Sequence, residues 1–148
     1  MTFRLALIGA GRMGATHARA LASSNAVEIA CVVDPSDVAA AQVDAPRATL
    51  DDLPAVDGAL VAVPTRLHVE VMTRLAALGL PVLCEKPCGL TVEETTTIAA
   101  LGVRIQVAYW RRFVPALRAL RERIRQGELG TVVHVSSAQL DELTAVSV

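Results

Sequence analysis

The twelve residues FRLALIGAGRMG at positions 3–14 decide the fold of this chain. Residues 3–8 are mostly apolar and partly β-branched, which predicts a buried strand, and the residues after Gly14 have a helical composition. Between these two elements the glycines are spaced as G-x-G-x-x-G. A strand, a tight glycine turn and a helix in this order are typical of a unit that binds a dinucleotide.

Each glycine of this turn has a predicted task. Gly9 allows a sharp turn, Gly11 lets a pyrophosphate approach the backbone, and Gly14 lets the helix pack closely on the strand. The first amides of that helix, at Arg12 and Met13, have no partner within the helix and are expected to bind the phosphates, helped by the helix dipole. All five residues are therefore predicted to contact the cofactor.

Asp34 follows the second predicted strand, Val27 to Val33, and lies twenty residues after Gly14. At that place a carboxylate can accept hydrogen bonds from the ribose hydroxyls of a bound dinucleotide. The alternative is that Asp34 caps a helix that begins at Pro35. The next basic residue is Arg47. A 2′-phosphate is therefore not expected to find a cation here, and NAD is predicted in preference to NADP.

Apolar runs and helical patterns alternate along the rest of the chain. Further strands are predicted at 59–63, 81–84 and 103–108, and further helices at about 35–42, 66–78, 91–100 and 115–126. This alternation predicts an α/β fold of the Rossmann type, a doubly wound parallel sheet with helices on both faces. A last predicted strand, 131–140, has no helix after it. We expect a dinucleotide-binding domain at 1–113 and, at 114–148, a connecting helix and the first strand of an incomplete second α/β domain.

Composition limits the class of protein. The chain has 148 residues, 53% of them hydrophobic, and a formal net charge of −1, so no overall field favours nucleic acid or an anionic membrane. No apolar run is long enough to cross a bilayer. Seven of the fourteen basic residues lie between Arg104 and Arg125, and all seven are Arg. They predict a solvated helix face, with an anion-binding face as the alternative.

The three cysteines, Cys31, Cys84 and Cys88, form no CxxC pair and leave an odd one under any pairing. This count suits a reducing cytoplasm and gives no reason to expect a metal site. Together with the charge, it predicts a cytoplasmic protein whose partner is a small molecule.

Two later motifs join the glycine turn and Asp34. They are Val63-Pro64-Thr65-Arg66-Leu67-His68 and Glu85-Lys86-Pro87, and a third segment is Ala108-Tyr109-Trp110-Arg111-Arg112-Phe113. With these elements in order the chain resembles, over roughly residues 3–138, the Gfo/Idh/MocA family of glucose-fructose oxidoreductases, inositol dehydrogenases and rhizopine-catabolism proteins. The resemblance implies an NAD(P)-dependent dehydrogenase that exchanges hydride between nicotinamide and a secondary alcohol of a sugar, cyclitol or related small molecule.

Within this resemblance Lys86 aligns with the lysine of the family, and it is the only lysine in the chain. Its ammonium can donate to the reacting oxygen and stabilise alkoxide character as hydride leaves carbon. The alternative is an ordinary surface lysine. Glu85 is expected either to orient Lys86 or to form an ion pair at the strand end, and both residues are also predicted to contact the cofactor. Pro87 fixes the local backbone.

The resemblance also implies weaker candidates. Pro64 is placed beside the nicotinamide, Thr65 is a cofactor contact or a helix cap, and His68 contacts cofactor or substrate or packs in the interior. Tyr109 and Arg111 match the segment that leads to the substrate in relatives. His17 is expected to be structural, and Trp110 and Phe113 are expected to be core residues.

Members of the family continue into a second α/β domain that supplies most of the substrate pocket and a catalytic histidine. His134 lies in the predicted strand 131–140 and does not match that histidine. We therefore expect the chain to bind dinucleotide but to turn over poorly, and to form a homo-oligomer or belong to a longer chain. The alternative function is a non-catalytic dinucleotide-binding regulatory module, which would not need Lys86. Nucleic-acid binding through the Arg-rich helix is disfavoured because no aromatic pattern accompanies the charge.

Overall fold

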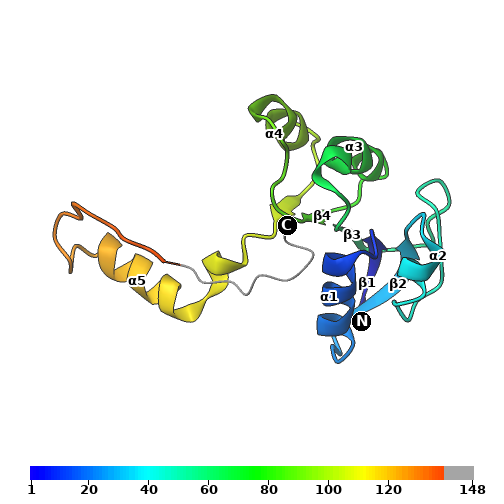
Figure 1. Cartoon of the computed structure of the whole chain (residues 1–148), viewed down its shortest axis with the longest axis horizontal. Helices are drawn as coiled ribbons and strands as arrows, with labels where there is room; N and C mark the ends of the chain where they lie inside the picture. Colours follow the sequence, from blue (N-terminus) through cyan, green and yellow to red (C-terminus); the bar gives the residue numbers. More distant parts are fainter. Residues whose placement is uncertain (139–148) are drawn as a thin grey trace. The chain divides into compact units, whose positions relative to one another are not determined.

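The computed structural model describes residues 1–138, and residues 139–148 lie outside this range (Figure 1). The chain divides into two compact units, Met1–Tyr109 and the part from Trp110 onward. No helix among the described residues is long and apolar enough to span a membrane.

The first unit is built on a five-stranded parallel sheet. The strands are β1 (Phe3–Ile8), β2 (Val27–Val33), β3 (Gly58–Val61), β4 (Val82–Cys84) and β5 (Ile105–Val107). Their order across the sheet is β2-β1-β3-β4-β5, and every pairing is parallel. The chain therefore reverses its winding direction between β1 and β3, which is the place where open sheets of this kind bind ligands. The predicted doubly wound parallel sheet is confirmed.

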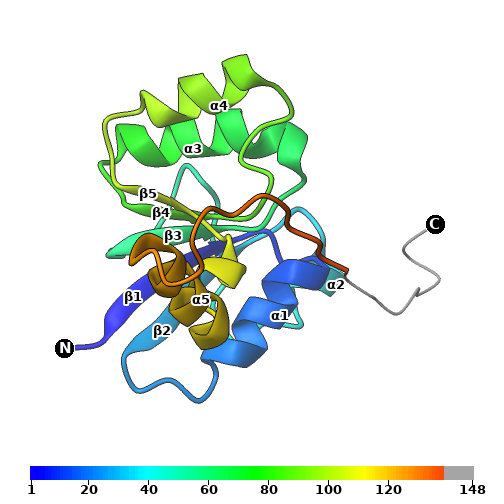
Figure 2. The same ribbon diagram turned by 90° about the vertical axis from the view of Figure 1, so that its left-hand side faces the viewer.

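Helices cover both faces of this sheet. They are α1 (Arg12–Leu21), α2 (Asp37–Ala40), α3 (His68–Ala77) and α4 (Val92–Ala99), with a short 3₁₀ turn, η1, at Thr65–Leu67. Figure 2 shows α3 and α4 on one face and α1 on the other. This arrangement follows from the crossover connections between parallel strands, each of which must pass over one face of the sheet.

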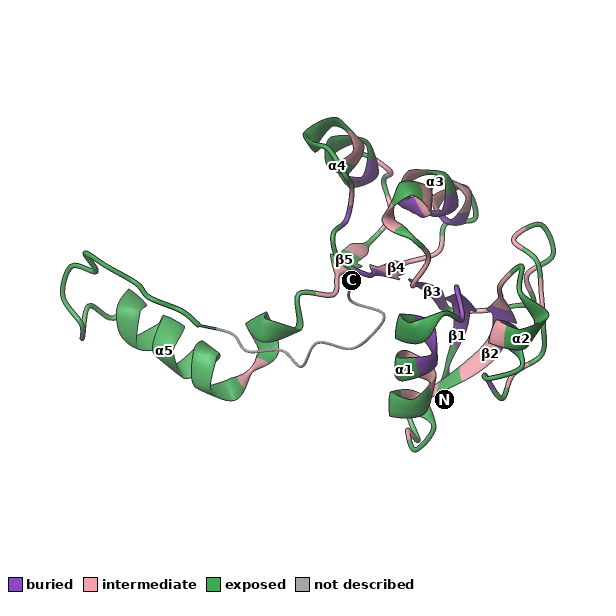
Figure 3. Ribbon diagram, in the orientation of Figure 1, coloured by how far each residue is buried: buried purple, intermediate pink, exposed green. Residues whose placement is uncertain are grey.

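The alternation of side chains along β1 explains why the fold has two cores. Leu5 and Leu7 lie in the cluster that reaches α1 and α2, whereas Ala6 and Ile8 lie in the cluster that reaches α3 and α4. All four are buried, and buried residues gather on the strands and on the inner sides of the helices (Figure 3). A central strand with both faces covered must be apolar where it is covered, as residues 5–8 are, whereas Arg4 lies in the exposed first part of the strand.

The helix after β2 is shorter than the sequence predicts. It spans Asp37–Ala40, and its N-cap is Ser36, whose hydroxyl accepts a hydrogen bond from the amide of Ala39 at 3.2 Å. The alternative role for Asp34, capping this helix, is therefore wrong, because Ser36 takes it. The physical reason is that Pro35 precedes the helix instead of starting it.

In the second unit, described up to residue 138, the chain forms a 3₁₀ turn, η2 (Trp110–Phe113), and the helix α5 (Pro115–Arg125), which the sequence predicts. The expectation that Trp110 and Phe113 are core residues is wrong, since they are 62% and 58% exposed. The described part of the predicted strand 131–140, residues 131–138, is not a strand. A strand needs a hydrogen-bonded neighbour, and no described strand pairs with this segment. Residues 139 and 140 lie outside the described residues.

Candidate functional site

The turn between β1 and α1 has no room for side chains at two of its three glycines. Gly9 has a φ of +93°, and a Cβ atom there would lie 2.8 Å from the backbone carbonyl of Ala62, which follows β3. A Cβ atom at Gly14 would overlap the carbonyl oxygen of Gly9. The backbone of β1, the start of α1 and the end of β3 therefore meet at closest approach here, as the glycine spacing predicts.

Gly11 differs from the other two glycines, because a Cβ atom there would meet nothing within 4 Å. It is the N-cap of α1, and no side chain caps the helix. Arg12 and Met13 form its first turn and are both exposed. The ten-residue helix thus presents unpaired amides to open space beside a residue without a side chain. A pyrophosphate fits this arrangement, since its charge would be met by amide donors and by the positive end of the helix dipole.

Asp34 is fixed at the edge of this turn. Its Oδ2 atom accepts a hydrogen bond from the amide of Ala10 at 2.7 Å, and its Oδ1 atom accepts one from the amide of Ser36 at 2.8 Å. Each carboxylate oxygen has two lone pairs, so capacity remains for hydroxyl donors. The residues at this place therefore fit the ribose of a dinucleotide as well.

An arginine lies beside Asp34, although the sequence places it thirteen residues away. The guanidinium of Arg47 donates to the carbonyl oxygen of Asp34 at 2.8 Å and forms an ion pair with Asp37. The sequence-based expectation that no cation stands near Asp34 is therefore wrong. The reason is that the segment after α2 returns to β2, where Arg47 forms an isolated parallel bridge with Val32.

The segment after β3 carries three candidates. Pro64 is exposed and is the N-cap of η1, so Thr65 lies inside the 3₁₀ turn and is not a cap. His68 is 1% exposed. Its Nε2 atom lies 3.0 Å from the carbonyl oxygen of Val63 and its Nδ1 atom 3.1 Å from that of Cys88. The imidazole is enclosed and joins two loops, which favours the packing role over a contact with cofactor or substrate.

Glu85 and Lys86 follow β4 at the same edge of the sheet, and the Lys86–Pro87 peptide bond is cis. Glu85 is 8% exposed. Its Oε2 atom accepts a hydrogen bond from the backbone amide of Lys86 at 3.1 Å. Lys86 is exposed, and its ammonium forms no ion pair with any residue of the described range 1–138. The Lys86 side chain is thus available to a ligand, while Glu85 contacts Lys86 through the backbone.

Glu85 has a side-chain partner that the sequence did not predict. The Nε2 atom of His17 lies 2.7 Å from Oε1 of Glu85, and these two side chains are 24% and 11% exposed. An ionised carboxylate can only accept, so the imidazole nitrogen donates. One signal was present in the sequence: His17 lies three residues after Gly14, so it shares the sheet-facing side of the helix, where a polar side chain needs a partner.

The substrate candidates lie at the boundary of the two units. Tyr109 is the last residue of the first unit and is half exposed. Arg111 belongs to the second unit, where its guanidinium carbon lies 5.4 Å from the centre of the Trp110 ring. Each is described within its own unit, and their assignment to the substrate stays a prediction.

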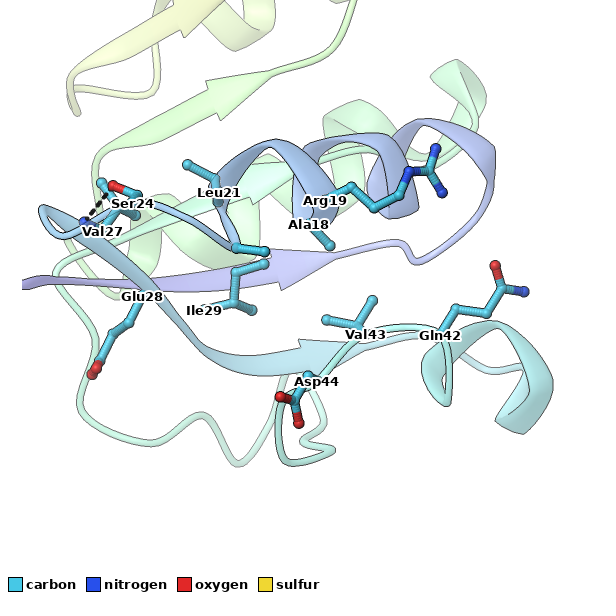
Figure 4. A pocket seen from close by; sticks show the side chains of 11 residues that line it. Ala18, Arg19, Leu21, Ser24, Val27, Glu28, Ile29, Gln42, Val43 and Asp44 are labelled. Atoms are coloured by element: carbon cyan, nitrogen blue, oxygen red, sulfur yellow. Dashed lines mark hydrogen bonds between the residues drawn. The ribbon is translucent and has the colours of Figure 1, made fainter.

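Two pockets lie away from the glycine turn. One, of about 360 Å³, is formed by α1, β2 and the segment after α2, with Arg19, Glu28 and Asp44 on its walls (Figure 4). The other, of about 340 Å³, is mostly apolar and is lined by Phe3, Leu60 and neighbouring residues of the sheet. Neither contains Lys86 or a glycine of the turn. No cluster of His, Cys, Asp or Glu in the described residues could hold a metal ion.

Comparisons with known proteins agree with this geometry. The family model described as "Oxidoreductase family, NAD-binding Rossmann fold" matches residues 3–113. The rhizopine catabolism protein MocA of Rhizobium meliloti is 46% identical over 95% of this chain and 48% of its own length. The scyllo-inositol 2-dehydrogenase (NAD(+)) of Bacillus subtilis is 31% identical over 94% of this chain and 45% of its own.

A solved structure shows the same likeness. The crystal structure of a myo-inositol dehydrogenase from Corynebacterium glutamicum has a TM-score of 0.76 and 30% identity, over 88% of this chain and 43% of that one. The chain spans about half the length of the curated relatives it matches.

Proposed function

This chain belongs to the Gfo/Idh/MocA oxidoreductase family, and from that premise we propose that it is the NAD-binding half of a dehydrogenase that acts on a secondary alcohol of a cyclitol or related polyol. The observation that carries the proposal is that three candidate segments lie at the same edge of the sheet. The glycine turn after β1, Pro64 after β3 and Lys86 after β4 all follow the carboxyl ends of neighbouring parallel strands.

The cofactor contacts are proposed from the fit of the residues. The amides of Arg12 and Met13 would hold the pyrophosphate above Gly11, and Asp34 would accept from the ribose hydroxyls. NAD is proposed over NADP because Asp34 presents a carboxylate where a 2′-phosphate would have to lie, and because the nearby Arg47 is already paired with Asp37. The presence of an NAD-specific name among the relatives supports the same choice.

A nicotinamide cofactor bound at this site would supply the acceptor for the hydride of the carbinol carbon. Lys86 is the proposed catalytic residue: its ammonium would donate to the substrate oxygen and stabilise the negative charge that develops there. We place the acceptor of the hydroxyl proton outside residues 1–138, because the resemblance implies a catalytic histidine in the second domain and because Glu85, the carboxylate beside Lys86, already accepts from His17 and from the Lys86 amide. The pair of a hydride acceptor and a proton acceptor balances the oxidation of alcohol to ketone.

The wider assignments are proposals as well. Residues 1–113 would form the dinucleotide-binding domain, and 114–148 would be the connecting helix and the start of a second α/β domain. The extent of the family match and the coverage of the relatives support this division. A homo-oligomer or a longer chain would complete the substrate pocket, with Tyr109 and Arg111 on the substrate side. The three free thiols support a location in the cytoplasm.

Calorimetric titration tests the cofactor assignment. We expect NAD⁺ to bind more tightly than NADP⁺, and K86M to lose much less NAD⁺ affinity than rate, because Lys86 is only one of several predicted cofactor contacts. With myo-inositol or scyllo-inositol as substrate, K86M should lose NADH formation on the order of a hundredfold relative to any rate of the wild type. Absence of NAD⁺ and NADP⁺ binding by the folded chain would overturn the proposal. A rate that K86M leaves unchanged would instead favour a site in which Lys86 has no catalytic part.

A further inference from the structure

We propose that His17 is a positioning residue for Lys86: through the carboxylate of Glu85 it fixes the backbone of Lys86 to α1, the helix whose N-terminus would hold the cofactor phosphates. The inference rests on the proposed function and adds a residue that the sequence motifs do not include. It assigns His17 no contact with the cofactor or the substrate.

The contacts form one continuous chain. His17 donates from Nε2 to Oε1 of Glu85 at 2.7 Å, and the other carboxylate oxygen, Oε2, accepts from the amide of Lys86 at 3.1 Å. The Glu85 residue is 8% exposed. A carboxylate removed from water needs donors on its oxygens, and here one donor comes from α1 and the other from the loop that carries Lys86. The carboxylate therefore has a fixed orientation only while both donors are present.

His17 belongs to the same helix as the amides that are proposed to bind the cofactor phosphates. His17 lies six residues after Gly11 on α1, a distance of about 9 Å along a rigid helix. Gly14, on the same side of α1, lies against the carbonyl of Gly9, so α1 packs on the end of β1 in close contact. One rigid element thus carries both the phosphate-binding amides and the anchor of the Lys86 loop. This element therefore sets the spacing between the phosphate-binding amides and the loop that carries Lys86.

The geometry also separates positioning from simple packing. A packing role for Glu85 would be satisfied by any group that fills the space, but the Lys86 amide needs an acceptor at one place. Lys86 itself is exposed, so its side chain takes its position from its own backbone. Loss of the His17 donor should therefore change the Lys86 backbone more than it changes the phosphate site.

Because Lys86 is the only lysine, protein labelled with ¹⁵N-lysine gives a single backbone amide signal. This signal reports on the amide that donates to Oε2 of Glu85. We expect H17A to move this signal and to speed its hydrogen exchange about tenfold, while NAD⁺ affinity changes less than about threefold. H17Q, which keeps a donor, should restore part of the wild-type signal. His134, exposed and in the second unit, supplies the matched control, and H134A should leave signal, exchange and affinity unchanged.

A Lys86 signal and exchange rate that are the same in H17A and H134A, in protein that binds NAD⁺, would overturn the inference and leave the proposed function standing. Failure of wild-type protein to bind NAD⁺ would overturn the proposed function whatever the Lys86 amide does. If H17A does not fold, E85Q replaces it, because it keeps the shape of the side chain and weakens both hydrogen bonds. An unaltered Lys86 amide in folded E85Q would equally overturn the inference.

Discussion

The carboxylate of Asp34 accepts a hydrogen bond from the amide of Ala10 at 2.7 Å, so the end of β2 is tied to the turn that follows β1. The residue proposed to bind the ribose is thus held by the same turn that is proposed to bind the pyrophosphate. Such a carboxylate has little freedom to move before a ligand arrives, and this lowers the entropic cost of binding.

Replacement of Asp34 by Ala should weaken NAD⁺ binding by about tenfold to a hundredfold, because hydrogen bonds to a charged acceptor are lost. The same change removes the acceptor of the Ala10 amide, so the free energy of unfolding should also fall. D34N is the matched variant, since it keeps a carbonyl oxygen for that amide and loses the charge. Calorimetry and urea unfolding separate the two effects. Equal NAD⁺ affinity in the wild type and D34A would show that Asp34 does not bind the ribose.

Alanine at Gly11 and alanine at Gly14 should have opposite consequences. G11A places its methyl group in open space, so the free energy of unfolding should change by less than about 1 kcal/mol, whereas NAD⁺ affinity should fall about tenfold or more. G14A forces its methyl group against the carbonyl oxygen of Gly9 and should destabilise the fold by about 2–3 kcal/mol or more. Urea unfolding and calorimetric titration of both variants check this. If G11A binds NAD⁺ normally, the phosphates do not lie above Gly11.

The coenzyme preference should depend on Asp37. In the wild type its carboxylate pairs with Arg47, which also donates to the carbonyl of Asp34 at 2.8 Å. D37N should release this guanidinium toward a 2′-phosphate, and the ratio of NADP⁺ to NAD⁺ affinity should rise severalfold, up to about tenfold. R47Q is the control, because it should abolish the gain in a D37N background. A ratio that stays constant in D37N would place Arg47 outside the reach of the ribose.

Stability should fall at alkaline pH through the buried thiols. Burial, with contributions from the neighbouring Cys88 and Glu85, raises the pKa of Cys84 to about 12. Burial also raises the pKa of Cys31 and of Cys88. A raised pKa in the folded state means that folding favours the protonated thiol. The resulting stability is complete below the pKa of an unfolded thiol, about 8.5, and is lost as the pH rises toward 12.

Urea unfolding between pH 7 and pH 11 measures this effect, and C84A provides the comparison. The free energy of unfolding of C84A should start lower, because a buried side chain is shortened, but should fall less steeply above about pH 9. The native protein should also react slowly with thiol reagents at pH 8, and unfolded protein should react fast. Parallel pH profiles for the two proteins would contradict the assignment of the effect to Cys84.

Local patterns in the sequence predicted most of the fold. The glycine spacing of residues 9–14 and the continuous apolar runs each predict a turn or a strand from residues that are close together in the sequence. The parallel sheet then follows from the alternation of the predicted strands and helices. The predicted strand 131–140 was wrong over its described part, residues 131–138, because a strand forms only beside a hydrogen-bonded neighbour, which no local pattern supplies. The predicted burial of Trp110 and Phe113 was wrong for a related reason. Hydrophobicity predicts that burial of a side chain is favourable, but burial also needs another part of the protein to cover it.

The candidate site was predicted less completely, since its contacts join residues far apart in sequence. His17 and Glu85 are separated by 68 positions, and a helix histidine carries no sign of which strand end it will meet. Arg47 was dismissed because of its distance from Asp34 along the chain, but the return of the segment after α2 to β2 brings it back. For His68 the sequence left open a contact with cofactor or substrate and a packing role, because its two carbonyl partners could not be predicted from the residues beside it.

The position of β1 in the middle of the sheet has a consequence for synthesis on the ribosome. β1 leaves the exit tunnel before both of its neighbours in the sheet, and the second of them, β3, is not complete until Val61 has emerged. Until then the apolar strand β1 of the nascent chain has no hydrogen-bonded partner on one of its edges. A pause in translation between the codons for β1 and those for β3 would therefore lengthen the time during which one edge of β1 has no partner strand.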